Sequence, residues 1–169
     1  MADIKYKEIE GDLITMFKNE ELDVIVHGAN CHNVMGAGIA RQISLEFPNI
    51  LDVDKKYIIP VSDVRRLGNY SSLTVLRGKR PGWIVNAYTQ YNTGKNLDYN
   101  ALELVLKKIN FAFRPERVGL PGFIGAGIAG GNANIIRKII QRQLKDCDVT
   151  VVFLPQNSHM MLEEFKFKY

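Results

Sequence analysis

The chain has 169 residues, of which 46% are hydrophobic and 24% are charged, and its formal net charge is +4. These values are ordinary for a globular domain with its own core, and they exclude a wholly disordered chain. The sequence contains no run of eighteen apolar residues and no signal-like start, so we expect a cytoplasmic protein rather than a membrane or exported one. Two distant cysteines, Cys31 and Cys147, are typical of a reducing compartment.

The predicted elements alternate between strand and helix along the chain. The strand signal is clearest at Val24–Val26, because three consecutive β-formers are typical of a strand covered on both faces. The helix signal is clearest after Asp98, an N-cap residue followed by apolar residues at helical spacing. In chain order we predict a strand at 5–10, a helix at 13–17, a strand at 23–28, helices at 39–47 and 52–57, strands at 73–77 and 82–88 around a turn at 78–81, a helix at 98–111, a strand at 117–120, a helix at 135–144, a strand at 149–154 and a last helix or turn at 160–167.

This alternation predicts a single α/β domain over residues 1–169. In such domains a largely parallel sheet lies between layers of helices, which gives three layers in all. Ligands of these sheets bind beyond the carboxyl ends of the strands. We therefore expect the functional residues in the loops that follow the strands.

Two glycine-rich loops follow predicted buried strands. The first includes Met35-Gly-Ala-Gly-Ile-Ala40 and comes after a turn that holds Asn30 and His32, and the second runs from Gly119 to Gly131. Glycine lets backbone N–H groups approach oxygen atoms closely, and a helix N-terminus adds a favourable dipole. Neither loop matches the dinucleotide or the lysine-containing phosphate-loop pattern. The pair predicts a ligand with two anionic or sugar-like segments, such as a nucleoside diphosphate sugar.

The basic residues are dispersed along the chain. Their densest groups are Arg65–Arg66, Arg77 with Lys79–Arg80, and Lys107–Lys108. No aromatic-interleaved RNA-binding motif or helix-turn-helix pattern accompanies them. We interpret these groups as solvated surface and expect no nucleic-acid partner on their account.

Five short motifs, in order along nearly the whole chain, suggest a family. They are Gly11-Asp12-Leu13-Ile14, Val26-His-Gly-Ala-Asn30, Met35-Gly-Ala-Gly-Ile-Ala40, Val85-Asn-Ala-Tyr-Thr-Gln90 and Gly125-Ala-Gly-Ile-Ala-Gly-Gly131. Together they resemble the motifs of macrodomains, which bind ADP-ribose and its derivatives. The chain looks closest to the compact branch similar to ADP-ribose 1''-phosphate phosphatases, which occurs in phages, bacteria and yeast. The resemblance implies a mixed, mostly parallel sheet of about six strands between helices, and a host cytoplasm if the chain is of phage origin.

The resemblance also implies roles for individual residues. Asp12 would accept a hydrogen bond from the adenine amino group, and Asn30 would hold the distal ribose, where the chemistry occurs. From the residues alone, Asp12 is in the first place a helix N-cap, and Asn30 is a turn residue satisfied by local backbone. The glycine loops would hold the diphosphate through neutral backbone amides. The implied substrate-binding residues are Asp12, Leu13, Gly36, Ala37, Gly38, Ile39, Thr89, Gln90, Gly125, Ala126, Gly127, Ile128 and Ala129.

Two histidines lie near the motif that contains Asn30. His27 stands where many macrodomains have an asparagine, and its place inside a strand favours a core residue. His32 lies two residues past Asn30 in the active-site loop. Because histidine changes charge near neutral pH, our hypothesis is that His32 orients or deprotonates water near the distal phosphate. Asn30 and His32 are thus the predicted catalytic residues.

The departures from the family pattern bear on the mechanism. Gln90 stands where relatives that form a lysine adduct have a lysine, and Ala129 stands where they have an aspartate. These differences favour direct attack by water. The histidines and carboxylates show no metal-ligand spacing, so we predict neither a metal nor a cofactor. Cys31 adjoins Asn30, but no Cys-His-Asn arrangement indicates a cysteine nucleophile.

The sequence predicts an enzyme that binds ADP-ribose and hydrolyses ADP-ribose 1''-phosphate to ADP-ribose and phosphate. Two alternatives stay open: an ADP-ribosyl hydrolase that releases ADP-ribose from modified protein or nucleic acid, and a non-catalytic ADP-ribose-binding module. We expect no membrane partner, and nucleic acid only as an ADP-ribosylated substrate. The adenine-stacking group is expected around residues 155–157.

Overall fold

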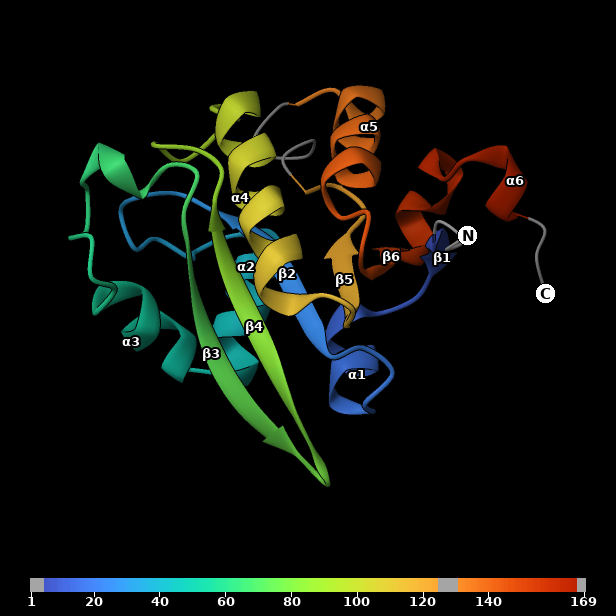
Figure 1. Ribbon diagram of the computed structural model, residues 1–169, viewed down its shortest axis with the longest axis horizontal. Helices are drawn as coiled ribbons and strands as arrows, with labels where there is room; N and C mark the ends of the chain where they lie inside the picture. Colours follow the sequence, from blue (N-terminus) through green and yellow to red (C-terminus); the bar gives the residue numbers. More distant parts are fainter. Residues whose placement is uncertain (1–4, 125–130, 167–169) are drawn as a thin grey trace.

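The computed structural model of the protein describes residues 5–124 and 131–166. Its six strands form one sheet in the order β1-β6-β5-β2-β4-β3 (Figure 1). Every described pair of neighbours is parallel except β3 with β4, so the predicted mixed, mostly parallel sheet is confirmed. The strands are β1 (Tyr6–Glu10), β2 (Val24–Ala29), β3 (Tyr70–Arg77), β4 (Arg80–Tyr88), β5 (Arg117–Pro121) and β6 (Asp148–Phe153).

Helices cover both faces of this sheet and complete the three layers. In Figure 1, α4 and α5 stand side by side across one face, and α1 and α2 lie on the other. Among the described residues no helix is long and apolar enough to cross a membrane. The helices are α1 (Leu13–Lys18), α2 (Gly38–Glu46), α3 (Asn49–Lys55), α4 (Tyr99–Phe113), α5 (Ala133–Gln143) and α6 (Glu163–Lys166), with 3₁₀ turns η1 (Val64–Arg66) and η2 (Pro155–Met160).

The central strand β2 contributes to the core on both faces. Val24 and Val26 pack with the residues of α4 and α5, whereas Ile25 packs with those of α1 and α2, and all three are fully buried. Side chains alternate between the faces of a strand, so a strand covered on both sides needs apolar residues at successive positions. This is why the consecutive β-formers predicted β2 correctly.

Among the predicted boundaries that were wrong, two involve proline. The helix predicted at 52–57 begins at Asn49, because Pro48 ends α2 and then stands at the start of α3. Proline is tolerated there since the first helical N–H groups have no intrahelical acceptor. The turn predicted at 78–81 is shorter, because β4 already begins at Arg80. Pairing of β4 with β2 starts only at Trp83, so Pro81 interrupts no ladder on that side.

The interpretation of two arginines as solvated surface was also wrong. Arg66 is 0% exposed and pairs with Asp54 at 2.8 Å. Arg77 is buried with its guanidinium over the ring of Phe17, and it donates to the Phe17 carbonyl at 2.7 Å. A buried guanidinium is tolerated when its N–H groups find acceptors. Those acceptors come from distant segments, which a count of basic residues does not reveal.

Candidate active site

A cavity of about 570 Å³ lies at the carboxyl ends of the parallel strands. Its volume is typical of a small-molecule site. The segments after β1, β2, β4, β5 and β6 all contribute to its wall, because parallel strands present their carboxyl ends at one edge of the sheet. Lining residues that the sequence predicted are Asp12, Leu13, Asn30, Gly36, Ala37, Gly38, Ile39 and Gln90.

The amino end of α2 faces this cavity without a side-chain cap. The N-caps of α1, α4 and α5 are Asp12, Asp98 and Asn132, and each side chain accepts a backbone N–H bond. At α2 the N-cap is Ala37, which has no such side chain. The first N–H groups of a helix lack intrahelical partners and attract negative charge. This end of α2 therefore offers free donors to an anionic ligand.

Asp12 satisfies the helix and still borders the cavity. Its Oδ1 accepts from the backbone N of Thr15 at 2.9 Å, which is the N-cap bond of α1. A carboxylate has two oxygens, so Oδ2 keeps its acceptor capacity. Capping and ligand binding are thus compatible, and the adenine contact stays a prediction.

Asn30 lines the cavity and also closes its own loop. Its Nδ2 donates to the Val34 carbonyl at 2.8 Å, and its Oδ1 accepts from the backbone N of His32 at 2.9 Å. One hydrogen on Nδ2 and one lone pair on Oδ1 stay available for a ligand. The turn role considered from the sequence is therefore present, and it fixes the amide for a second contact.

His32 is not among the residues that line the cavity. Its Nδ1 bonds Ser62 Oγ at 2.7 Å, its Nε2 bonds Asn92 Oδ1 at 3.0 Å, and its ring meets Tyr91 edge to face. Both ring nitrogens thus already have partners within the protein. The His32 ring therefore connects the loop of Asn30 to the loops of Ser62 and Asn92, and its action on water stays a prediction.

His27 is a core residue, as the sequence favoured, and it also lines the cavity. The side chain is 0% exposed, and its Nε2 bonds Asn86 Oδ1 at 2.6 Å. Nδ1 has no hydrogen-bond partner within the described part of the chain. Burial, the largest influence, lowers the pKa of His27. The one sequence signal that could have placed His27 in the cavity wall was that it replaces the asparagine found in many macrodomains.

Gln90 and Thr89 differ in their placement. Gln90 lines the cavity, and its Nε2 donates to the carbonyls of Asn92 and Gly94. Thr89 is fully buried outside the cavity wall. The predicted residues Gly125, Ala126, Gly127, Ile128 and Ala129 lie outside the described residues.

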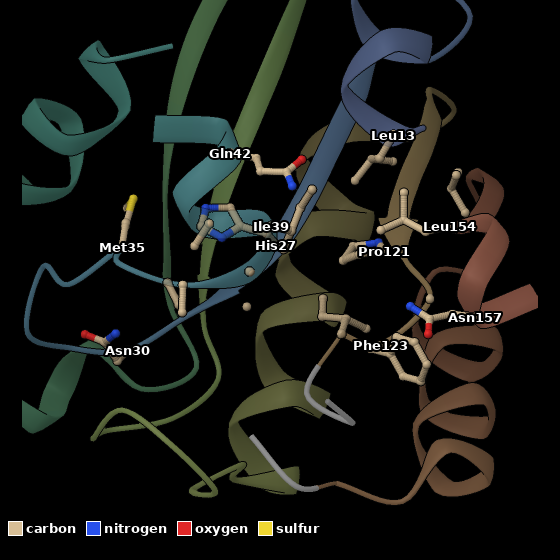
Figure 2. A pocket seen from close by; sticks show the side chains of 18 of the residues that line it. Leu13, His27, Asn30, Met35, Ile39, Gln42, Pro121, Phe123, Leu154 and Asn157 are labelled. Carbon is tan, nitrogen blue, oxygen red and sulfur yellow. The ribbon is translucent and has the colours of Figure 1, made fainter. Parts of the chain in front are cut away.

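Several lining residues were missed by sequence reasoning. Figure 2 shows Asn30 and Met35 on one side of the cavity and Leu13, Leu154 and Asn157 on the other. Asn157 falls in the region expected for the adenine contact, but Leu154 had no sequence signal. Gln42 lies one helical turn after Gly38, so the period of α2 pointed to it. Other lining residues that were missed include Val34, Gly94, Pro121, Phe123 and Phe153.

Cys31 is buried beside the site, and it is not a lining residue. Burial, the largest influence, raises the pKa of its thiol to about 11. Within the described ranges, no three His, Cys, Asp or Glu side chains gather as a metal site.

The fold defines the class of protein. The macrodomain of Thermus aquaticus DarG is 22% identical and superposes with a TM-score of 0.63 over 88% of this chain and 97% of its own. A Thermosipho africanus DarTG structure in complex with ADP-ribose is 16% identical, with a TM-score of 0.69 over 97% of this chain and 46% of its own. The chain therefore has the macrodomain fold.

A relative in sequence identifies the family more narrowly. An uncharacterised 17.5 kDa protein from the tk-vs intergenic region of Enterobacteria phage T4 is 34% identical over 150 residues. The match covers 86% of this chain and 94% of the phage protein. The chain belongs to the same family as this phage protein. No protein-family model matches the chain.

Proposed function

We propose that the chain binds ADP-ribose in the cavity and hydrolyses ADP-ribose 1''-phosphate. The observation that supports this most is the uncapped amino end of α2 within the cavity wall of a macrodomain fold. Free helical N–H groups are suited to a diphosphate. The Thermosipho africanus protein of the same fold was solved with ADP-ribose, which agrees with a ligand of this kind.

An extended nucleotide sugar fits the arrangement of the lining residues. Asp12 and Asn157 would receive the adenine at one end, where the free oxygen of Asp12 accepts from the amino group. The loop Gly36–Gly38 would hold the diphosphate, and Asn30 would hold the distal ribose. The binding groups are mostly backbone amides, which stabilise negative charge without carrying a charge themselves.

In the proposed reaction, water attacks the phosphorus of the 1''-phosphate. The bond from phosphorus to the ribose oxygen breaks, the ribose oxygen acquires a proton, and phosphate leaves with the oxygen of water. Donors fixed around the phosphate stabilise the charge of the transition state, so positioning is the main source of rate. His32 supports this reaction as a positioning residue, because its ring holds the loop of Asn30 against Ser62 and Asn92.

Calorimetric titration with ADP-ribose, followed by phosphate release from ADP-ribose 1''-phosphate, tests this function. Asp12→Ala should weaken binding at least about tenfold, or about 1.4 kcal/mol. Asp98→Ala is the matched control, because it removes the N-cap of α4 and has no contact with the cavity. Absence of binding to the wild type would reject the function, and equal weakening by both variants would reject the adenine contact.

The exposed rim gives a reason to test a second reaction. Val34 is 50% exposed beside Asn30, and the loop Gly36–Gly38 is exposed, so a larger group attached at the distal ribose has space. We therefore infer that release of ADP-ribose from a modified peptide or oligonucleotide is the alternative activity. Binding with turnover of neither substrate class would instead indicate a non-catalytic binding module.

A further inference from the structure

A row of buried polar side chains leads from the cavity across the sheet. The strand register places His27 opposite Asn86 and Asn86 opposite Ser71, so one residue each of β2, β4 and β3 stands in line. Opposite residues of paired strands share a face and lie close enough to bond. His27 Nε2 is 2.6 Å from Asn86 Oδ1, and Asn86 Nδ2 is 3.1 Å from Ser71 Oγ.

The row continues into a buried ion pair on the far side. Ser71 Oγ lies 2.7 Å from the hydroxyl of Tyr88, and this hydroxyl donates to Asp54 Oδ1 at 2.5 Å. Arg66 Nη1 donates to the same carboxylate oxygen at 2.8 Å and to the Tyr88 hydroxyl at 3.1 Å. Every member of the row is buried, and the most exposed, Ser71, is only 5% exposed. Bulk water therefore does not compete for these bonds.

The ion pair sets the direction of every bond in the row. A carboxylate paired with a guanidinium only accepts, so the Tyr88 hydroxyl donates to Asp54. The Tyr88 oxygen then accepts from Ser71, and the Ser71 oxygen accepts from the Asn86 amide NH₂. The Asn86 carbonyl is left facing His27, and a carbonyl needs a donor. His27 must therefore carry its proton on Nε2.

We propose that this row holds the neutral His27 ring with Nδ1 unprotonated, so that the cavity wall presents a hydrogen-bond acceptor to a hydroxyl of the ligand or of a bound water. Nδ1 is buried and lacks a partner among the described residues, and His27 lines the cavity. His27 makes the contact, and Asn86, Ser71 and Tyr88 are positioning residues. The ligand part of this inference rests on the proposed function, whereas the proton position belongs to the free protein.

Nitrogen NMR of the histidine rings tests the proton position without any ligand. In protein labelled with ¹⁵N-histidine, His27 should show a protonated Nε2 and a pyridine-like Nδ1, with the assignment made by loss of the signals in His27→Gln. Ser71→Ala interrupts the row and should let a population with Nδ1 protonated appear. Ser72→Ala is the matched control, because the next residue on β3 points to the other face of the sheet. Once His27→Gln has assigned the signals, a wild-type His27 ring protonated on Nδ1 would overturn the proposal, even if Ser71→Ala does not fold.

The ligand contact is tested by titrating ADP-ribose into the same variants. Ser71→Ala and Tyr88→Phe should each weaken binding about fivefold, as for one lost hydrogen bond, and Ser72→Ala should leave it unchanged. The Nδ1 signal of the wild type should shift on binding. Unchanged affinity in both row variants, together with an unmoved Nδ1 signal, would overturn the contact. If the wild type does not bind ADP-ribose at all, the proposed function and the ligand contact fail together, and the proton position is still decided by the unliganded spectrum.

Discussion

The amino edge of the sheet, where the parallel strands begin, and its carboxyl edge, where they end, differ in how they use charged groups. At the amino edge, Asp23 lies between three arginines, with Arg117 Nε at 2.9 Å, Arg80 Nη2 at 3.2 Å and Arg77 Nη2 at 3.6 Å. Asp23 precedes β2, and Arg80 and Arg117 begin the neighbouring strands β4 and β5. Parallel strands start at the same edge, so these side chains meet there.

At the carboxyl edge the same strands end in loops with few charged groups. Gly36–Gly38, the uncapped amino end of α2 and the amide of Asn30 line the cavity, and Asp12 is its one charged lining residue among those described. At the amino edge, the side-chain charges pair with one another and stabilise the fold. Neutral backbone donors leave the other edge free for a charged ligand. The following four changes test this contrast.

Asp23→Asn should have the largest effect, and on stability alone. The arginines would lose their shared carboxylate partner, and breaking a buried ion pair costs about 3 kcal/mol of unfolding free energy. Urea unfolding at neutral pH measures this loss. ADP-ribose affinity of the folded variant should equal that of the wild type. A stability change below about 0.5 kcal/mol, the usual range of surface substitutions, would contradict the structural role of this edge.

Lowering the pH should reduce the stability of the fold, because it protonates the carboxylate of Asp23. Burial by itself raises the pKa of Asp23, but the hydrogen bonds and charge of Arg117 and the charge of Arg80 outweigh burial and hold the pKa at about 2, against an ordinary 3.8. Because the pKa is lower in the folded protein, Asp23 stabilises the fold above its ordinary pKa. This contribution, about 2 kcal/mol, is lost as the pH falls from about 4 to about 2.

The measurement is the pH dependence of urea unfolding in wild type and Asp23→Asn. The variant should lose less stability than the wild type over this acidic range. Burial and the Asp23 charge raise the pKa of neighbouring Glu116, which acts with the opposite sign, so the difference between the two proteins is the relevant quantity. Parallel curves would show that Asp23 does not titrate differently in the folded state.

A pair of glycine substitutions should have smaller effects at the carboxyl edge. Gly38 has a φ of +57°, a left-handed conformation that costs other residues about 1 kcal/mol. Gly38→Ala should lower stability by that amount and weaken ADP-ribose binding, since the amino end of α2 shifts. Gly36→Ala is the control for stability, because an added Cβ there meets nothing within 4 Å. Equal stability loss in both variants, by thermal unfolding, would exclude this explanation.

The smallest expected effect concerns the two thiols. Burial is the first cause that raises the pKa of Cys31 and of Cys147 to about 11. A neutral thiol is a poor nucleophile, so iodoacetamide near neutral pH should modify neither residue in the folded protein and both after unfolding. Mass spectrometry of the alkylated protein gives the answer. Rapid modification of Cys31 in the folded state would reopen a cysteine nucleophile beside Asn30.

Local sequence patterns determined the layers and the main loop of the site. The apolar run Val24–Val26 predicts a strand covered on both faces, and Asp98 predicts the start of α4, since both depend only on neighbouring residues. The loop Gly36–Gly38 was placed correctly between a strand and a helix for the same reason. The position of this loop at the carboxyl edge then follows from the parallel arrangement of the strands.

The partners within the site were decided by the tertiary structure alone. His27 meets Asn86, 59 residues away, only because β2 pairs with β4 in one particular register. Between residues 49 and 70 the sequence predicted only the helix at 52–57. This segment nevertheless holds the ion pair of Asp54 and Arg66, which orients the whole buried row. Helix and strand propensities act over a few residues, whereas strand order and register depend on the packing of the complete chain. The sequence by itself therefore determined which loops surround the cavity, and the packed sheet decided which histidine faces it.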